Sequence, residues 1–82
     1  MGRDEVFEQV VKILTPYVKN QEALDSISAS AHILDELKVN SARLVDVVLE
    51  FEDAFDIEIA DEDVDSVETV GNAVDLIVAK LG

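Results

Sequence analysis

The 82-residue chain contains no cysteine, and its six Lys and Arg residues are outnumbered by 19 Asp and Glu residues. Without cysteine there is no disulfide framework, no thiolate metal site and no thiol nucleophile. Direct binding to nucleic acid is excluded, because phosphate neutralisation requires clustered Lys and Arg, whereas here they are few and dispersed. The formal net charge of -13 instead indicates partners with basic surfaces.

Glycine and long apolar runs are also scarce. The three glycines are scattered, so the chain has no glycine-rich phosphate-binding loop. No apolar run approaches the roughly 20 residues that a membrane-spanning helix needs, and the acidic amino terminus lacks the apolar region of a signal peptide. The sequence therefore predicts no membrane span and a cytoplasmic location.

Hydrophobic residues, in contrast, are abundant and make up 49% of the chain, too many for a disordered acidic tail. A domain of this length buries only about 60% of the surface that its unfolded chain exposes. That leaves room for one modest core and for no large enclosed active site. We expect residues 1–82 to form one domain and the protein to be a monomer.

Apolar residues at spacings of three and four predict three main helices. The first follows Asp4, its expected cap, and ends near residue 15 because Pro16 disrupts the next turn. The second spans residues 41–55 after Asn40 or Ser41, and the third follows Thr69. The predicted core positions on these helices are Val6, Phe7, Val10, Val11, Leu14, Tyr17, Val18, Leu44, Val48, Phe51, Phe55, Val70, Ala73, Val74, Ile77 and Leu81.

The remaining segments predict one more short helix and two connections. Residues 19–40 read as a long connection with one helical turn near Glu22, and residues 56–59 alternate like a short extended segment. Residues 61–67 contain the short helix. A connection this long needs anchors in the core, for which the candidates are Leu24, Ile27, Ile33, Leu34 and Leu37. The predicted fold class is all-α: a four-helix bundle of three main helices and one short one.

Acidic residues are concentrated between Asp46 and Glu68, and no basic residue lies between Arg43 and Lys80. One interpretation is an ordinary solvated helix surface. The other is that these carboxylates attract a basic partner. The density of charge supports it, because it exceeds what solubility needs and the repulsion between the carboxylates destabilises the compact state. Asp61-Glu62-Asp63-Val64-Asp65 resembles the start of an EF-hand, but Ser66 and Asn72 replace the loop's glycine and its final glutamate, so we expect no dedicated metal site.

The titratable and hydroxyl residues indicate no catalytic site. His32 is the single histidine, and without a cysteine or a second histidine it does not form a metal site. A role as general base would require a nucleophile and a pocket, and the sequence indicates neither. Ser41 on its own is typical of a helix start, where serine satisfies a backbone amide. Any further role for Ser41 depends on its context.

Two stretches downstream of Ser41 follow a family pattern. One is Phe51-Glu52-Asp53-Ala54-Phe55-Asp56-Ile57-Glu58-Ile59, an apolar-acidic-acidic-x-Phe-x-aliphatic-x-Ile run that precedes Asp61-Glu62-Asp63. The other is Thr69-Val70-Gly71-Asn72-Ala73-Val74-Asp75-Leu76-Ile77, with a Thr-Val start and an internal Asp. From Leu37 to Ile77 the chain resembles the phosphopantetheine-bearing acyl carrier protein family.

The resemblance implies an acyl-carrier-protein-like bundle in which Ser41 is the modified serine. Ser41 would carry 4'-phosphopantetheine through a phosphodiester, and the arm's thiol would carry an acyl or aminoacyl group. The chain itself would not be an enzyme. The implied partners are a phosphopantetheinyl transferase, an acyl-loading ligase or synthase, and acyltransferases with basic docking surfaces. The implied pathways are fatty-acid, lipid or secondary-metabolite synthesis.

The serine motif departs from the family's Leu-Gly-x-Asp-Ser-Leu, because here it reads Leu37-Lys38-Val39-Asn40-Ser41-Ala42 and is followed by Arg43. Asn40 and Arg43 make this corner more positive, and rim charges mainly alter encounter rate and partner choice. We therefore interpret the chain as a specialised carrier. A phosphate on Ser41 is expected to be stabilised by the helix dipole, by free amides and by a charge-assisted hydrogen bond from Arg43.

The second helix is the predicted docking element. Val45 and Leu49 lie one turn apart, away from the stripe of predicted core residues, and acidic residues surround them. The predicted partner-binding residues are Asn40, Ala42, Arg43, Val45, Asp46, Leu49, Glu50, Asp53 and Asp61. Two alternatives remain open at this stage: an unmodified, acidic helical interaction module with the carrier fold, and a divalent-cation buffer.

Overall fold

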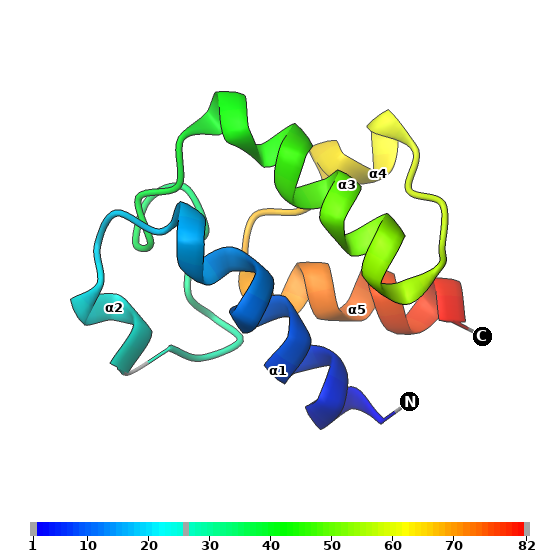
Figure 1. The fold of residues 1–82 in the computed structure, drawn as a ribbon, viewed down its shortest axis with the longest axis horizontal. Coiled ribbons are helices and arrows are strands. Elements are labelled where there is room, and N and C mark those ends of the chain that lie inside the picture. The colour runs from blue at the N-terminus through cyan, green and yellow to red at the C-terminus, as the bar shows by residue number, and fades with distance from the viewer. Residues whose placement is uncertain (1, 26, 82) are drawn as a thin grey trace.

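The computed structural model describes residues 2–25 and 27–81. Within these residues the α-helices are α1 (Arg3–Leu14), α2 (Glu22–Asp25), α3 (Leu44–Phe55), α4 (Asp61–Asp65) and α5 (Val70–Leu81), and the 3-10 turns are η1 (Thr15–Tyr17) and η2 (Ser41–Arg43). The three long helices surround the core, with α1 packed against α5 and α3 (Figure 1). The predicted all-α fold, with three main helices and a short one, is confirmed. No helix among the described residues is long and apolar enough to cross a membrane.

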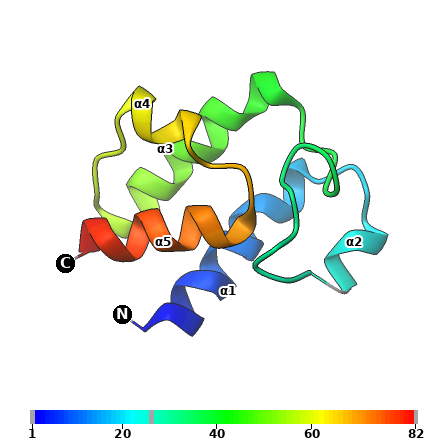
Figure 2. The ribbon, with the colours of Figure 1, turned by 180° about the vertical axis from the view of Figure 1, so that it is seen from behind.

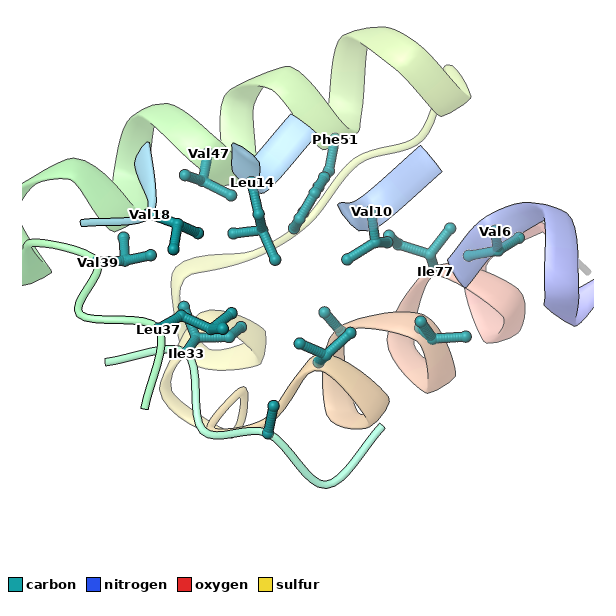
Figure 3. Packing of buried hydrophobic residues seen from close by; sticks show 14 of the residues in the cluster. Val6, Val10, Leu14, Val18, Ile33, Leu37, Val39, Val47, Phe51 and Ile77 are labelled. Carbon is teal, nitrogen blue, oxygen red and sulfur yellow. The ribbon is translucent and has the colours of Figure 1, made fainter. Parts of the chain in front are cut away.

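The core consists of aliphatic side chains from the three long helices and from the long connection, together with Phe51 and Phe55 of α3 (Figure 3). The fully buried side chains include Leu14, Ile33, Leu37 and Ile77. Each such side chain contributes roughly 1.5 to 3 kcal/mol of burial free energy. The helices are therefore held by their apolar stripes, as their periodicity predicts.

Several details of the sequence prediction are wrong. Gly2, not Asp4, is the N-cap of α1, and Asp4 lies in the first turn. Leu34 and Leu81 were predicted to be core, yet they are 41% and 39% exposed. On α3, Val47 is fully buried, whereas Leu44 is only partly buried. The core stripe of α3 is therefore turned slightly from its predicted position.

Pro16 acts as predicted. α1 ends at Leu14 and continues into η1, where Pro16 stands at the start of a 3-10 turn. Proline is accepted there because a first-turn residue has no intrahelical amide bond to lose.

The long connection is fastened to the start of α5 by backbone hydrogen bonds. The amide of Ile33 donates to the Glu68 carbonyl at 3.0 Å, and the amides of Val70 and Gly71 donate to the carbonyls of Ala31 and Ala29 at 3.0 and 2.7 Å. An isolated antiparallel bridge pairs residues 32 and 69 in the same stretch. Figure 2 shows this connection passing beside the start of α5. These bonds fix the segment that leads to Ser41.

Thr69 caps α5 as predicted. Its Oγ1 accepts from the Asn72 amide at 3.1 Å, and Asn72 Oδ1 accepts from the amides of Glu68 and Thr69 at 3.1 and 3.0 Å. This reciprocal arrangement satisfies amides that a helix start leaves without partners.

Candidate functional site

Ser41 is the first residue of η2, which leads directly into α3, and its side chain is exposed. The preceding Asn40 is extended, with φ -63° and ψ 128°, and its Oδ1 accepts from the Ala42 amide at 2.9 Å. The predicted cap is therefore confirmed for Asn40. Figure 1 shows the chain entering α3 at one edge of the molecule, and all three residues of η2 are exposed.

The amides around Ser41 are not free, contrary to the sequence expectation. The Ala42 amide is bound by Asn40, the Arg43 amide donates to the Asn40 carbonyl at 2.8 Å, and the Leu44 amide donates to the Ser41 carbonyl. A 3-10 turn uses its amides one residue earlier than an α-helix does, because its hydrogen bonds span three residues. A phosphate on Ser41 would therefore meet the helix dipole with fewer open donors.

Arg43 also differs from its expected role. Its Nη1 lies 3.2 Å from Asp46 Oδ2, so the guanidinium pairs with the first carboxylate of α3 instead of being free for a phosphate. Both side chains remain largely solvent-accessible, at 65% and 47%. Such an exposed pair contributes at most about 1 kcal/mol, so a partner can displace it at little cost.

Lys38 is a feature that the sequence analysis did not identify as functional. Its φ of 59° lies in the left-handed region, while its neighbours Leu37 and Val39 are both buried. Anchoring both neighbours in the core forces the backbone to turn at Lys38, and the Val39 amide donates to the Ile33 carbonyl at 3.2 Å. For a non-glycine residue this conformation costs about 1 to 2 kcal/mol. The signal was available: the family pattern has glycine at this position.

The exposed face of α3 matches the prediction. Val45 and Leu49 are 61% and 56% exposed, which is more than the exposed fractions of Leu34 and Leu81. Glu50 and Asp53 are exposed beside them, and Asp46 is partly exposed. Residues at this spacing share one side of a helix. The structure thus brings together an apolar pair and three carboxylates on one face.

Asp61, the first residue of α4, joins this face across a groove. The groove has a volume of about 340 Å³ and is lined by Val45, Val48, Ile59, Asp61, Val64 and Asp65. Beneath it lies an apolar cavity of only about 10 Å³, lined by residues that include Leu44, Phe51 and Leu76. A space of that size is at the lower limit for one water molecule, so the core is closed in this conformation.

Glu50 of α3 interacts with Tyr17 of η1. A hydrogen bond from the Tyr17 hydroxyl to the Glu50 carboxylate raises the pKa of Tyr17, and partial burial of the phenol and the charge of Glu50 add to the shift. η1 thereby supports the middle of α3 from the side.

An ion pair joins α4 to α5. Lys80 Nζ lies 3.2 Å from Asp63 Oδ2, which also accepts from the Ala60 amide at 3.3 Å. The hydrogen bond from Lys80, followed by that from Ala60, lowers the pKa of the Asp63 carboxyl below its ordinary value. The carboxylates of the EF-hand-like sequence lie on this short helix, and one of them is already engaged by Lys80.

The arrangement can hold the phosphopantetheine group that the family resemblance implies. An exposed serine hydroxyl at the extremity of the molecule is accessible for a phosphodiester. The groove between α3 and α4, bordered by Val45 and Asp61, offers an apolar wall close to the same helix. When attached, the group supplies the thiol that this cysteine-free chain lacks.

Comparisons with known proteins identify the family. The family described as "Phosphopantetheine attachment site" matches residues 17–77. The acyl carrier protein of Petrotoga mobilis is 37% identical over 81 residues, which cover 99% of this chain and 93% of that protein. The acyl carrier protein of Thermotoga maritima is 34% identical over 81 residues, with 99% and 98% covered.

A solved structure of the acyl carrier protein from Enterococcus faecalis superposes with a TM-score of 0.80 at 40% identity, covering 98% of this chain and 99% of that one. A crystal structure of the acyl carrier protein from Thermotoga maritima gives a TM-score of 0.78 at 26% identity, covering 96% and 89%. Members of this family are carriers rather than enzymes, and their prosthetic group is a covalently attached 4'-phosphopantetheine. The helical fold and these matches show that the chain belongs to the acyl carrier protein family.

Proposed function

We propose that Ser41 is the attachment site and that the chain delivers an acyl or aminoacyl thioester to enzymes of fatty-acid, lipid or secondary-metabolite synthesis. The observation that carries the proposal is the exposed Ser41 at the start of the helix that also presents Val45 and Leu49. A modified residue and a docking face on one rigid helix keep the arm in a constant position relative to a bound partner. The protein's own task is then to hold and present the cargo, since the reacting thiol belongs to the arm.

The docking surface in this proposal is the α3 face with its neighbours. Val45 and Leu49 supply apolar contact, and burying them fully would contribute roughly 1.5 to 3 kcal/mol each. The surrounding carboxylates attract basic side chains of the transferase, the loading ligase or synthase, and the acyltransferases. The docking residues proposed are Asn40, Ala42, Arg43, Val45, Asp46, Leu49, Glu50, Asp53 and Asp61. The proposal takes residues 1–82 as one monomeric, cytoplasmic domain.

Intact-mass measurement tests the attachment site. The protein is incubated with coenzyme A and a broad-specificity phosphopantetheinyl transferase, and the mass is expected to rise by one phosphopantetheine. Ser41→Ala should show no gain, whereas Ser30→Ala, which changes another exposed serine, should be modified like the wild type. A gain that persists in Ser41→Ala would refute the assignment. No gain in the wild type would favour the unmodified interaction module.

A further inference from the structure

The strained Lys38 lies in a part of the molecule where basic residues gather. The Asn20 amide donates to the Leu37 carbonyl at 3.3 Å, and Asn20 Nδ2 donates to the Glu36 carbonyl at 3.1 Å. These bonds lay the segment that contains Lys19 beside the segment that contains Lys38. Figures 1 and 2 both show the connection after η1 next to the chain that leads to η2.

Three of the six basic residues, Lys19, Lys38 and Arg43, therefore lie on the segment that contains Ser41 or on the segment hydrogen-bonded to it, and we call them the basic rim. All three are exposed. Residues 35–46 carry three acidic and two basic side chains, and Lys19 adds a third basic one. The net charge at this end of the molecule is therefore close to zero. Residues 46–68, in contrast, carry eleven acidic and no basic side chains. The surface near Ser41 thus changes charge within one turn of helix.

The backbone conformation at Lys38 indicates that the positive charge near Ser41 has a function. Glycine would adopt the left-handed conformation there without strain, yet the position holds a long charged side chain. Residues held in strained conformations cluster at functional sites, where the side chain's role offsets the conformational cost. Arg43 is oriented by its pair with Asp46, which keeps its charge at the junction between the rim and the α3 face.

We infer that the basic rim selects partner enzymes by charge: it offsets the carboxylates beside Ser41, so it fits enzymes whose basic docking face is confined to α3 and disfavours enzymes whose basic docking face continues over Ser41. Like charges brought together at an interface cost affinity and slow encounter, which makes repulsion an effective means of specificity. This inference rests on the proposed function, because the rim acts only on enzymes that reach Ser41 or its arm.

Modification kinetics provide the first test. The probe is a broad-specificity phosphopantetheinyl transferase with a basic docking face, at low ionic strength. Neutralising the rim with Lys19→Gln and Lys38→Gln should raise kcat/KM about threefold to tenfold, and it leaves the proposed docking residue Arg43 paired with Asp46. Lys38→Gln alone should give part of this rise. The matched control, Arg3→Gln with Lys12→Gln, makes the same change in net charge on α1 and should leave kcat/KM nearly unchanged.

Each kinetic outcome has a defined meaning. Modification at Ser41 with a rate that is unchanged or lower in folded rim variants would overturn the inference and leave the proposed function intact. Absence of any modification in the wild type would refute the proposed function, and for that case the second measurement still reports on the rim. Circular dichroism melting confirms that each variant is folded.

The second measurement compares an anionic with a cationic nitroxide by NMR. Amides of residues 38–43 should be broadened relatively more by the anionic probe than amides of residues 46–53. If the cationic probe broadened the amides of both segments more than the anionic probe did, and to the same extent, the inference would be overturned. The electrostatic potential at the rim would then equal that at the α3 face.

Discussion

The two ends of the functional surface are built differently. The segment that leads to Ser41 is fixed by backbone hydrogen bonds from the long connection to the start of α5, and it contains the left-handed Lys38. The acidic face formed by α3 and α4 is fixed by core packing under α3 and by one exposed ion pair, Asp63 to Lys80. Backbone bonds hold a fixed geometry, whereas an exposed ion pair yields easily. We therefore expect the segment that leads to Ser41 to be the rigid end and α4 to be the adaptable one.

The largest effect is expected where the rigid end meets α5. An added Cβ at Gly71 would lie 2.8 Å from the carbonyl oxygen of Ala29, a backbone atom that is itself hydrogen-bonded to Gly71. Helix propensity alone would make Gly71→Ala stabilising by about 1 kcal/mol. Overpacking reverses the sign, and we expect a loss of about 1 to 3 kcal/mol in urea unfolding.

Gly2→Ala is the control, because an added Cβ there has open space. Gly2 is the N-cap of α1, so only a small loss of capping is expected. Gly2→Ala should change the unfolding free energy by far less than Gly71→Ala. A stabilised Gly71→Ala would show that the connection is free to move away from α5, which would remove the distinction between a rigid and an adaptable end.

The second prediction concerns the acidic face. Changing Asp46 and Asp53 to Lys should slow modification and loading by basic-faced enzymes by about tenfold at low ionic strength and reduce the salt dependence of the rate. Stopped-flow or discontinuous assays across salt concentrations measure this. Glu5→Lys with Glu8→Lys makes an equal charge change on exposed positions of α1 and should have little effect.

An unchanged rate for the Asp46 and Asp53 variant at low ionic strength would contradict the docking role. Asp53→Lys alone should retain part of the effect, and it does so while the Arg43 pair with Asp46 stays in place.

The third prediction isolates the strain at Lys38. Replacement by glycine relieves a left-handed conformation that costs about 1 to 2 kcal/mol, but it also raises the entropy of the unfolded chain. The expected result for Lys38→Gly is a net stabilisation of up to about 1 kcal/mol. Lys38→Ala removes the same charge and keeps a Cβ, so it should bring no such gain. A Lys38→Gly variant that is less stable than Lys38→Ala would show that this backbone is unstrained, because only the entropy cost of glycine would then remain.

The smallest effect is expected at the adaptable end and depends on pH. Asp63 has a lowered pKa in the folded protein, so its ionised form stabilises the fold above the pKa of the unfolded chain, about 4. That stabilisation is lost as the pH falls through the lower folded value. Unfolding of wild type and Asp63→Asn should therefore differ at pH 7 and converge toward pH 3. Asp65→Asn, on the same helix, should show a smaller difference at pH 7.

Much of the site could be predicted from local patterns. The cap at Asn40 and the exposure of Val45 and Leu49 follow from residue types and helical spacing within a few positions. Leu34 and Leu81 were predicted wrongly because apolar character alone does not tell which side of a loop or helix end meets the core. The amides near Ser41 were predicted wrongly because spacing does not distinguish a 3-10 turn from an α-helix.

The sequence by itself determined the three long helices, the single aliphatic core and the acidic face, since each depends on periodicity and charge within one segment. Only the tertiary structure decided that the segment of Lys19 lies beside the segment of Lys38 and that Lys80 pairs with Asp63. Those features join residues that are distant in the chain, and their positions depend on how the buried side chains of other elements pack. The geometry around Ser41 is thus a product of the whole core, whereas the choice of Ser41 was predicted from the stretches downstream of it, at residues 51–59 and 69–77.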